Sequence, residues 1–268
     1  MVKGKPFLEV LASAVHEDYR FPILELFAFL YSLGTFVFAS FGSSIVTQTV
    51  TSESVAYTLA SSLLGLPLFI FIILIFKNIA YGLGSDLEKG IIQSYLSYPL
   101  KRWGLLTAKL VSAIGIALIL FLTIQISALY VLAPDVVSPY LGTVLLTYAA
   151  NLSPSLFVAG IMLLITLVLR RGGLTLVIGI VLYFAMSIVS SVAMVVAFAT
   201  DSQLPLQIMS VIAPNLVLAE YFSVNVGFGS QLWVPAFSDV LLFLGMSYAI
   251  VVFLFLLGYY YFSRRLGL

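Results

Sequence analysis

The chain has 268 residues, of which 62% are apolar and only 9% are charged, and its net charge is +1. This composition lies far from the average of soluble proteins and indicates a membrane protein. The absence of cysteine excludes disulfides and thiolate metal sites. The lack of a basic patch with interleaved aromatic residues outside the membrane-flanking loops argues against a nucleic-acid partner.

The charged residues are segregated, so apolar stretches long enough to cross a bilayer recur along the chain. A backbone in lipid must satisfy its own polar groups, and these stretches lack the alternation of a membrane barrel, which predicts helices. We therefore expect an all-α polytopic protein with a single transmembrane domain over residues 1–268. The six expected spans are 22–42, 57–81, 104–131, 142–169, 174–200 and 239–262.

Residues 1–21 precede the first span and are predicted to contain an amphipathic helix over 6–20. Its expected apolar stripe is Leu8, Leu11, Val15 and Tyr19. Its expected polar stripe is Glu9, Ser13, His16 and Arg20. The pattern fits an interfacial helix that turns into the bilayer near Pro22, and equally an arm that packs on a partner. The long segment before the first span favours an uncleaved anchor over a signal peptide.

The connection at 82–103 is charged and aromatic, which a simple turn between two spans does not need. Its apolar residues recur at helical intervals, namely Leu87, Ile91, Tyr95 and Tyr98. Asp86 and Glu88 would occupy the first turn, where acids complement the helix dipole, and Pro99 would end the helix.

Three prolines are expected to shape the rest of the chain. Pro67 and Pro154 should kink the second and fourth spans. The last loop, 201–238, is apolar but too short to cross, and it is interrupted at Pro214 and Asn215. We expect two half-helices there that form a re-entrant hairpin in the outer leaflet.

The basic residues all fall on one side of this predicted topology. They are Lys3, Lys5, Arg20, Lys77, Lys89, Lys101, Arg102, Lys109, Arg170, Arg171, Arg264 and Arg265. The opposite loops, 43–56, 132–141 and 201–238, contain no Lys or Arg. The sequence therefore predicts a multi-pass protein of the cell membrane with both termini in the cytoplasm.

Residues 88–109 read EKGIIQSYLSYPLKRWGLLTAK. This segment resembles the signature that follows the second span in type-2 ABC-transporter permeases. The matching residues occur in order and without gaps: Glu88, Lys89, Gly90, Leu96, Ser97, Pro99, Arg102, Trp103 and Lys109. Ile91 stands in place of the usual Thr, and Ala108 in place of the usual Gly.

The resemblance implies that this connection is a coupling helix seated in a groove of a separate cytoplasmic ATPase. The residues implied in coupling are Glu88, Gly90, Tyr95, Tyr98, Pro99, Lys101, Arg102 and Trp103. Exposed tyrosines and the tryptophan would act as anchors, and the charged residues would orient the partner. The alternative is an interfacial loop whose aromatic residues lie in the headgroup belt.

No phosphate-binding loop of the Walker type occurs in the sequence, so we expect no ATP hydrolysis by this chain itself. The resemblance implies instead that ATP and Mg²⁺ bind to the separate ATPase subunit. It also implies that two permease chains pair around one pathway, as a homodimer or as a heterodimer.

An ion-coupled secondary transporter or channel is the alternative function, and it would keep ionisable residues at mid-bilayer. Lys77, Lys109 and Glu25 instead lie near span ends, where we expect the lysines to snorkel and Glu25 to pair with a base. The lone histidine, His16, has no base partner or second ligand nearby, which argues against an enzyme.

Polar residues inside the spans are the candidates for a substrate path. They are Gln125, Asn151, Ser153, Ser187, Ser190 and Ser191. The alternative role for these residues is hydrogen bonding between helices. The sequence thus favours the permease subunit of an ATP-driven exporter, and a loosely apolar cavity would suit a hydrophobic or amphipathic cargo.

Overall fold

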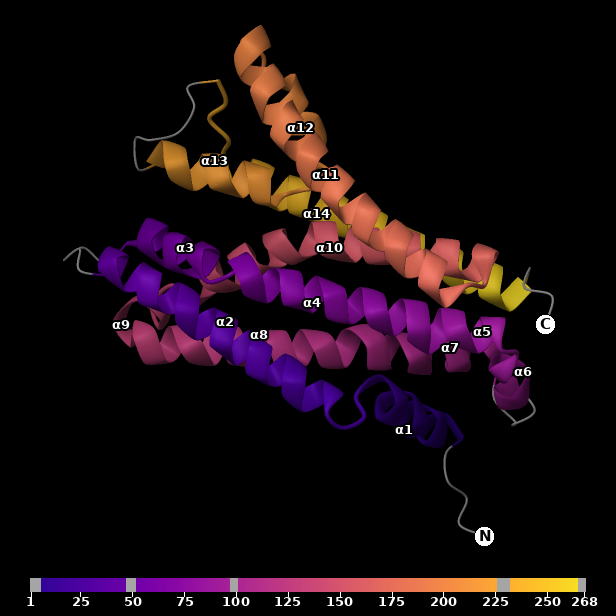
Figure 1. Cartoon of the computed structure of the whole chain (residues 1–268). Coiled ribbons are helices and arrows are strands. Elements are labelled where there is room, and N and C mark those ends of the chain that lie inside the picture. The colour runs from indigo at the N-terminus through magenta and orange to yellow at the C-terminus, as the bar shows by residue number, and fades with distance from the viewer. Residues whose placement is uncertain (1–5, 47–51, 97–100, 226–231, 265–268) are drawn as a thin grey trace.

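The computed structural model describes residues 6–46, 52–96, 101–225 and 232–264, and all regular structure within these ranges is helical. Five helical stretches are long and apolar enough to cross a membrane. A sixth is the bent pair of α1 (Pro6–Asp18) and α2 (Ile23–Val46), which together pass the same test (Figure 1). The chain is therefore an all-α polytopic protein, as its composition predicts.

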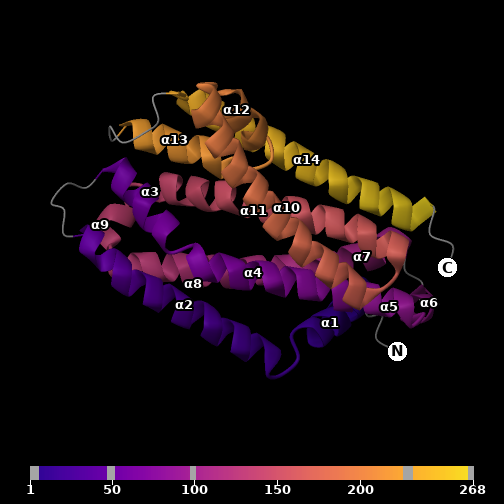
Figure 2. The ribbon, with the colours of Figure 1, turned by 45° about the horizontal axis from the view of Figure 1, so that its top comes forward.

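Two of the long stretches are composite helices with a π-helical turn inside. The first consists of α4 (Gly65–Lys77), η1 (Asn78–Gly84) and α5 (Ser85–Glu88). The second consists of α7 (Arg102–Leu110), η2 (Val111–Ile116) and α8 (Ala117–Leu132). The other three are α10 (Leu141–Leu169), α11 (Gly172–Thr200) and α14 (Phe237–Arg264). Figure 2 shows α10 running between α14 and α4, and it packs on both.

The second span differs from the predicted range of 57–81. A separate helix, α3 (Glu53–Ser62), comes first, and its N-terminus is capped by the Ser52 hydroxyl, which accepts from Val55 N. The spanning helix then begins at Gly65 and continues to Glu88. Pro67 explains the break, because proline lacks an amide hydrogen and its ring clashes with the carbonyl four residues earlier. Pro67 thus lies in the first turn of α4, and Pro154 lies inside α10.

The N-terminal helix α1 buries a different face from the predicted stripe. Its buried residues are Val10, Ala14 and Asp18, whereas Leu8 is 55% exposed. The helix packs on α7, η1 and η2, and it is bent by 62° from α2. Glu17 and Asp18 have partners on α7 and η2, so polar contacts help to decide which face turns toward the bundle, and the interfacial placement of the exposed apolar side stays a prediction.

The centre of the core is an aromatic cluster around Phe121 of α8. Its ring centroid lies 5.0 Å from that of Phe71 and 6.0 Å from that of Tyr31. Tyr148 of α10 completes the cluster at 6.2 Å in an edge-on arrangement. Such pairs contribute about 0.5–1.5 kcal/mol each beyond their burial, and packing of this kind holds helices together in lipid.

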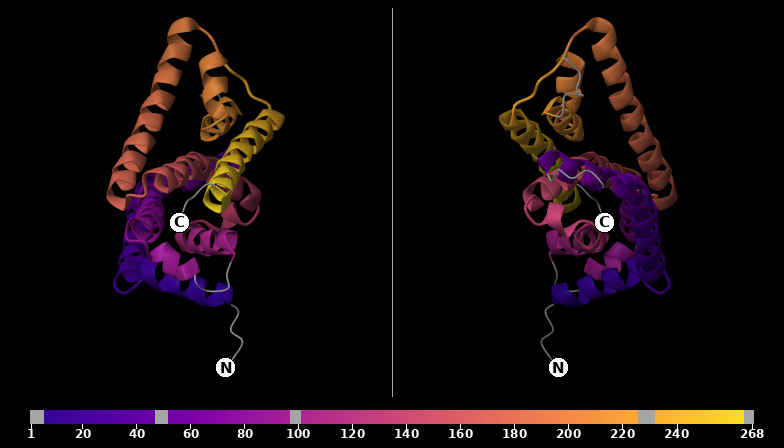
Figure 3. Two further views of the ribbon diagram at one scale, coloured as in Figure 1. Left: turned by 90° about the vertical axis from the view of Figure 1, so that its right-hand side faces the viewer. Right: turned by 90° about the vertical axis from the view of Figure 1, so that its left-hand side faces the viewer.

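The two half-helices predicted within 201–238 are present as α12 (Leu204–Ser210) and α13 (Asn215–Asn225). They are separated at residues 211–214, where the sequence predicts the interruption. Figure 3 shows α11 diverging from the rest of the bundle toward its C-terminal end, with the hairpin folded back between α11 and α14. The short helix α9 (Pro134–Val137) connects α8 to α10.

Candidate functional site

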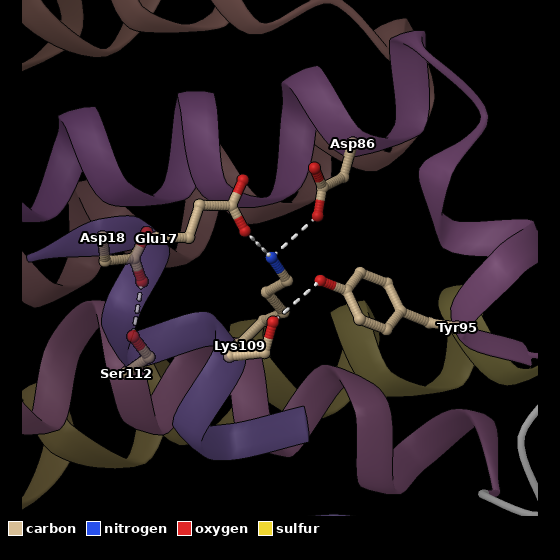
Figure 4. Close-up of polar contacts among 7 residues, drawn as sticks. Glu17, Asp18, Asp86, Tyr95, Lys109 and Ser112 are labelled. Atoms are coloured by element: carbon tan, nitrogen blue, oxygen red, sulfur yellow. Dashed lines mark hydrogen bonds and ion pairs between the residues drawn. The ribbon is translucent and has the colours of Figure 1, made fainter. Parts of the chain in front are cut away.

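A cluster of charged side chains lies where α1, α5, α7 and the short helix α6 (Ile91–Leu96) meet (Figure 4). At its centre is Lys109, which is only 3% exposed. Its Nζ lies 2.7 Å from Glu17 Oε2 and 2.7 Å from Asp86 Oδ2. The prediction that Lys109 snorkels is therefore wrong, because two carboxylates compensate its charge inside the protein.

Tyr95 of α6 closes the cluster on the side of the loop. Its ring centroid lies 5.4 Å from Lys109 Nζ, within the range of a cation–π interaction. Its hydroxyl lies 3.3 Å from Ser13 Oγ of α1. Tyr95 is half-buried and turned inward, so the expectation of an exposed aromatic anchor is wrong at this position.

The two π-helical turns, η1 and η2, lie side by side next to this cluster. Asn78 of η1 donates from Nδ2 to the Tyr19 hydroxyl at 3.0 Å, and that hydroxyl donates to the Ser112 carbonyl of η2 at 3.1 Å. π-Helical turns are rare and often occur at functional sites. The sequence analysis missed this network, although an asparagine within a strongly apolar stretch is a signal that could have found it.

Asp18 is the last residue of α1, before the bend that leads into α2, and it is only 2% exposed. The Ser112 hydroxyl donates to its Oδ2 (Figure 4). Burial raises the pKa of the Asp18 carboxyl to about 6, because desolvation outweighs the Ser112 hydrogen bond and the nearby lysine charges. Gly82 makes room for this side chain, since a Cβ there would lie 2.5 Å from Asp18 Oδ1.

Lys77 is held at the same end of the bundle and is half-buried. Its Nζ donates to the Asp18 backbone carbonyl at 2.8 Å and to Asn78 Oδ1 at 3.0 Å. The ammonium group of Lys77 is therefore also held by hydrogen-bond partners, and the prediction that it snorkels is wrong as well. A cleft of about 710 Å³ opens beside it, lined by both signs of charge, including Glu17, Arg20 and Lys89.

Glu88 connects this end of the second span to α11. Its Oε2 accepts from the backbone N–H of Gly172 at 3.3 Å, in the first turn of α11, where a negative charge complements the helix dipole. The two backbones approach closely there, because a Cβ on Gly172 would lie 2.7 Å from the Ala80 carbonyl oxygen. Glu88 is thus in contact with the fifth span.

The loop helix begins later than predicted. Gly90 adopts a positive φ of 72° and ends the second span after Glu88, so Asp86 and Leu87 belong to the span. The described part of helix α6 runs from Ile91 to Leu96. The residues expected to form the first turn of the coupling helix therefore form the last turn of the second span.

The remaining residues of the predicted coupling set lie around the start of α7. Trp103 is 56% exposed, Lys101 is exposed, and Arg102 is partly buried. Tyr98 and Pro99 lie outside the described residues. The outward surface of this loop thus presents a tryptophan and a lysine, as the coupling interpretation expects.

Three of the six residues predicted to line a substrate path lie together in one cleft, and the other three do not. Gln125 is buried and donates from Nε2 to Thr35 Oγ1 at 2.8 Å, and the Ser153 hydroxyl lies 2.5 Å from that of Ser247. These two residues bridge helices, and Ser191 donates to a carbonyl of its own helix and faces outward. The other three, Asn151, Ser187 and Ser190, line one cleft between α10 and α11.

No three His, Asp or Glu side chains are arranged to hold a metal ion in the part of the chain that the structure describes. In comparisons with known proteins, no family model matches the chain, and no curated protein or solved structure is significantly similar to it. The family resemblance of residues 88–109 therefore stays a prediction.

Proposed function

We propose that this chain is the permease subunit of an ATP-driven exporter, with ATP and Mg²⁺ bound to a separate ATPase subunit. It would lie in the cell membrane with both termini in the cytoplasm and pair with a second permease chain, as a homodimer or a heterodimer. One observation carries the proposal: the loop helix α6 and the last turn of the second span, which leads into it, are attached to three other helices. Asp86 pairs with Lys109 of α7, Tyr95 meets Ser13 of α1, and Glu88 meets Gly172 of α11.

A loop that only connects two spans needs none of these contacts. Each of the three joins the loop region to a helix by a directional polar contact, and the Asp86–Lys109 contact is buried. A displacement of α6 by a partner would therefore act on α1 through Tyr95, and on α7 and α11 through the last turn of the second span. Coupling between distant sites needs such a physical connection to elements that can move.

The outward side of the loop offers features of a protein-docking surface. Trp103 and Ile91 are exposed apolar side chains, and the exposed Lys101 lies two residues before Trp103 in the sequence. Exposed tryptophans surrounded by polar residues often carry a large share of the binding energy at interfaces. We expect this surface to contact the ATPase, while Tyr95 and Glu88 transmit its movement.

Purification in a gentle detergent tests the proposal directly. A tagged chain should co-purify with a protein that contains a phosphate-binding loop, and Trp103→Ala should reduce the recovered ATPase by about tenfold, which is typical of a residue that dominates an interface. The matched control is Tyr130→Ala, which removes another exposed aromatic residue at the end of α8. Monomeric protein that conducts gradient-driven flux in liposomes would instead support an ion-coupled carrier.

A further inference from the structure

A small cleft lies at the middle of the bundle, between α10, α11 and the elbow of the α12–α13 hairpin. Its volume is about 130 Å³, and its lining includes Ser155, Tyr183, Ser190 and Asn215. Ser155 is the fifteenth of the 29 residues of α10, and residue 186, which also lines the cleft, is the fifteenth of the 29 of α11. The cleft therefore lies at the centre of both spanning helices.

Two polar atoms in this cleft have no hydrogen-bond partner among the described residues. Ser155 is only 2% exposed, and its Oγ is unpartnered. The buried Oδ1 of Asn215 is also unpartnered. Two neighbouring hydroxyls do have partners: Ser153 pairs with Ser247, and Ser190 donates to the Met186 carbonyl. An unpaired polar atom at this depth is unfavourable, so it points to a group that fills the cleft.

The lining defines the chemistry of that group. Leu68 and Pro154 supply apolar surface, and no Asp, Glu, Lys or Arg is among the described residues that line the cleft. A charged headgroup would therefore find no opposite charge, which is costly at the centre of a membrane. An uncharged group with an O–H or N–H donor matches the Asn215 oxygen, and the Ser155 hydroxyl can donate or accept.

We propose that this cleft binds the neutral hydrogen-bonding head of an amphipathic molecule, such as an alcohol or an amide. Drug-sized pockets have volumes of roughly 300–1,000 Å³, so this cleft encloses only the head of such a molecule. Ser187 is exposed at its edge, and the apolar part of the ligand would leave by this side along α11. That the ligand is the exported cargo rests on the proposed function, whereas the site itself does not.

The test uses two photoreactive probes with the same aliphatic chain and diazirine, one ending in a hydroxyl and the other in a carboxylate. Both are added to membranes that contain the full chain, and the labelled peptides are mapped by mass spectrometry. The alcohol should label residues 151–155 and 183–190 at least about fivefold more than the carboxylate, since one net hydrogen bond changes binding by about this factor.

Single substitutions then separate the cleft from the rest of α10. Ser155→Ala and Asn215→Ala should each reduce labelling by the alcohol about fivefold. Ser153→Ala, two residues away, removes a hydroxyl that pairs with Ser247 and should leave labelling unchanged. Because the Ser155 hydroxyl has no partner, Ser155→Ala should also not lower the thermal stability of the ligand-free protein.

Equal labelling by the two probes, or full labelling of the Ser155→Ala protein, would overturn the proposal. The labelling needs no ATPase, so its outcome is independent of the co-purification experiment. A selective cleft in a chain that recruits no ATPase would refute the exporter and leave the binding site intact.

Discussion

Removing the positive charge of Lys109 should destabilise the protein more than any other single change at the loop end of the bundle. Two carboxylate oxygens lie 2.7 Å from its Nζ, and Asp86 is 2% exposed whereas Glu17 is 42% exposed. At an effective dielectric constant of about 20, one such pair has a Coulomb energy of about 6 kcal/mol before desolvation is subtracted. Breaking a buried pair from one side costs about 3–5 kcal/mol, and an exposed pair contributes about 0–1 kcal/mol.

Lys109→Met should therefore lower the melting temperature by about 10 °C, since each kcal/mol shifts a chain of this size by about 2–4 °C. The assay is thermal unfolding of the purified protein in detergent. Glu17→Gln should shift the melting temperature by about 4 °C at most, because that pair is partly solvated. The double variant Lys109→Met/Asp86→Asn should recover part of the loss, because it leaves no unpaired buried charge. Equal effects of Lys109→Met and Glu17→Gln would refute the reasoning that burial of Asp86 dominates.

Other parts of the network give further expected outcomes. The pKa of Asp18 is raised from 3.8 to about 6, so its proton is retained only in the folded state between these values. Stability should fall as pH rises through this range, and the melting-temperature advantage of wild type over Asp18→Asn should decrease from pH 4 to pH 7. Gly82→Ala should cost about 1–3 kcal/mol in thermal melts because its Cβ meets Asp18, whereas Gly142→Ala, with nothing within 4 Å, should be harmless. Tyr95→Glu should reduce cargo-stimulated ATPase activity of the purified complex at least about fivefold without changing membrane insertion, and unchanged stimulation would show that α6 does not couple. The single cysteine of Trp103→Cys should react with a membrane-impermeant thiol reagent only after cells are permeabilised, and labelling of intact cells would reverse the proposed orientation.

Hydropathy predicts the number and type of the long helices because a bilayer requires a long apolar helix whatever the fold. It does not predict where those helices break, and the second span shows why. No charged residue lies between position 57 and Pro67, so the expected span began at 57 instead of Gly65. At its other end, the charges of Asp86 and Glu88 suggested a loop, whereas the helix continues to Glu88 and both side chains have partners, on α7 and α11.

The candidate site was predictable only where its residues are close in sequence. Residues 88–109 stand out as a charged and aromatic stretch, and Trp103 is exposed there as expected. The partners of Lys109 come from positions 17 and 86, and no local pattern connects them. The same holds for the central cleft: Asn151 and Ser190 were recognised as polar residues within spans, but the role of Asn215 depends on the hairpin folding back onto α10.

Photo-crosslinking from the loop tests the central claim most directly. A photoreactive amino acid at position 103 in whole cells should form its main protein adduct with a subunit that contains a phosphate-binding loop, and the same residue at position 130 should not. Adducts from position 103 that contain only lipid or extracellular proteins would contradict a docking role for the connection between the second and third spans.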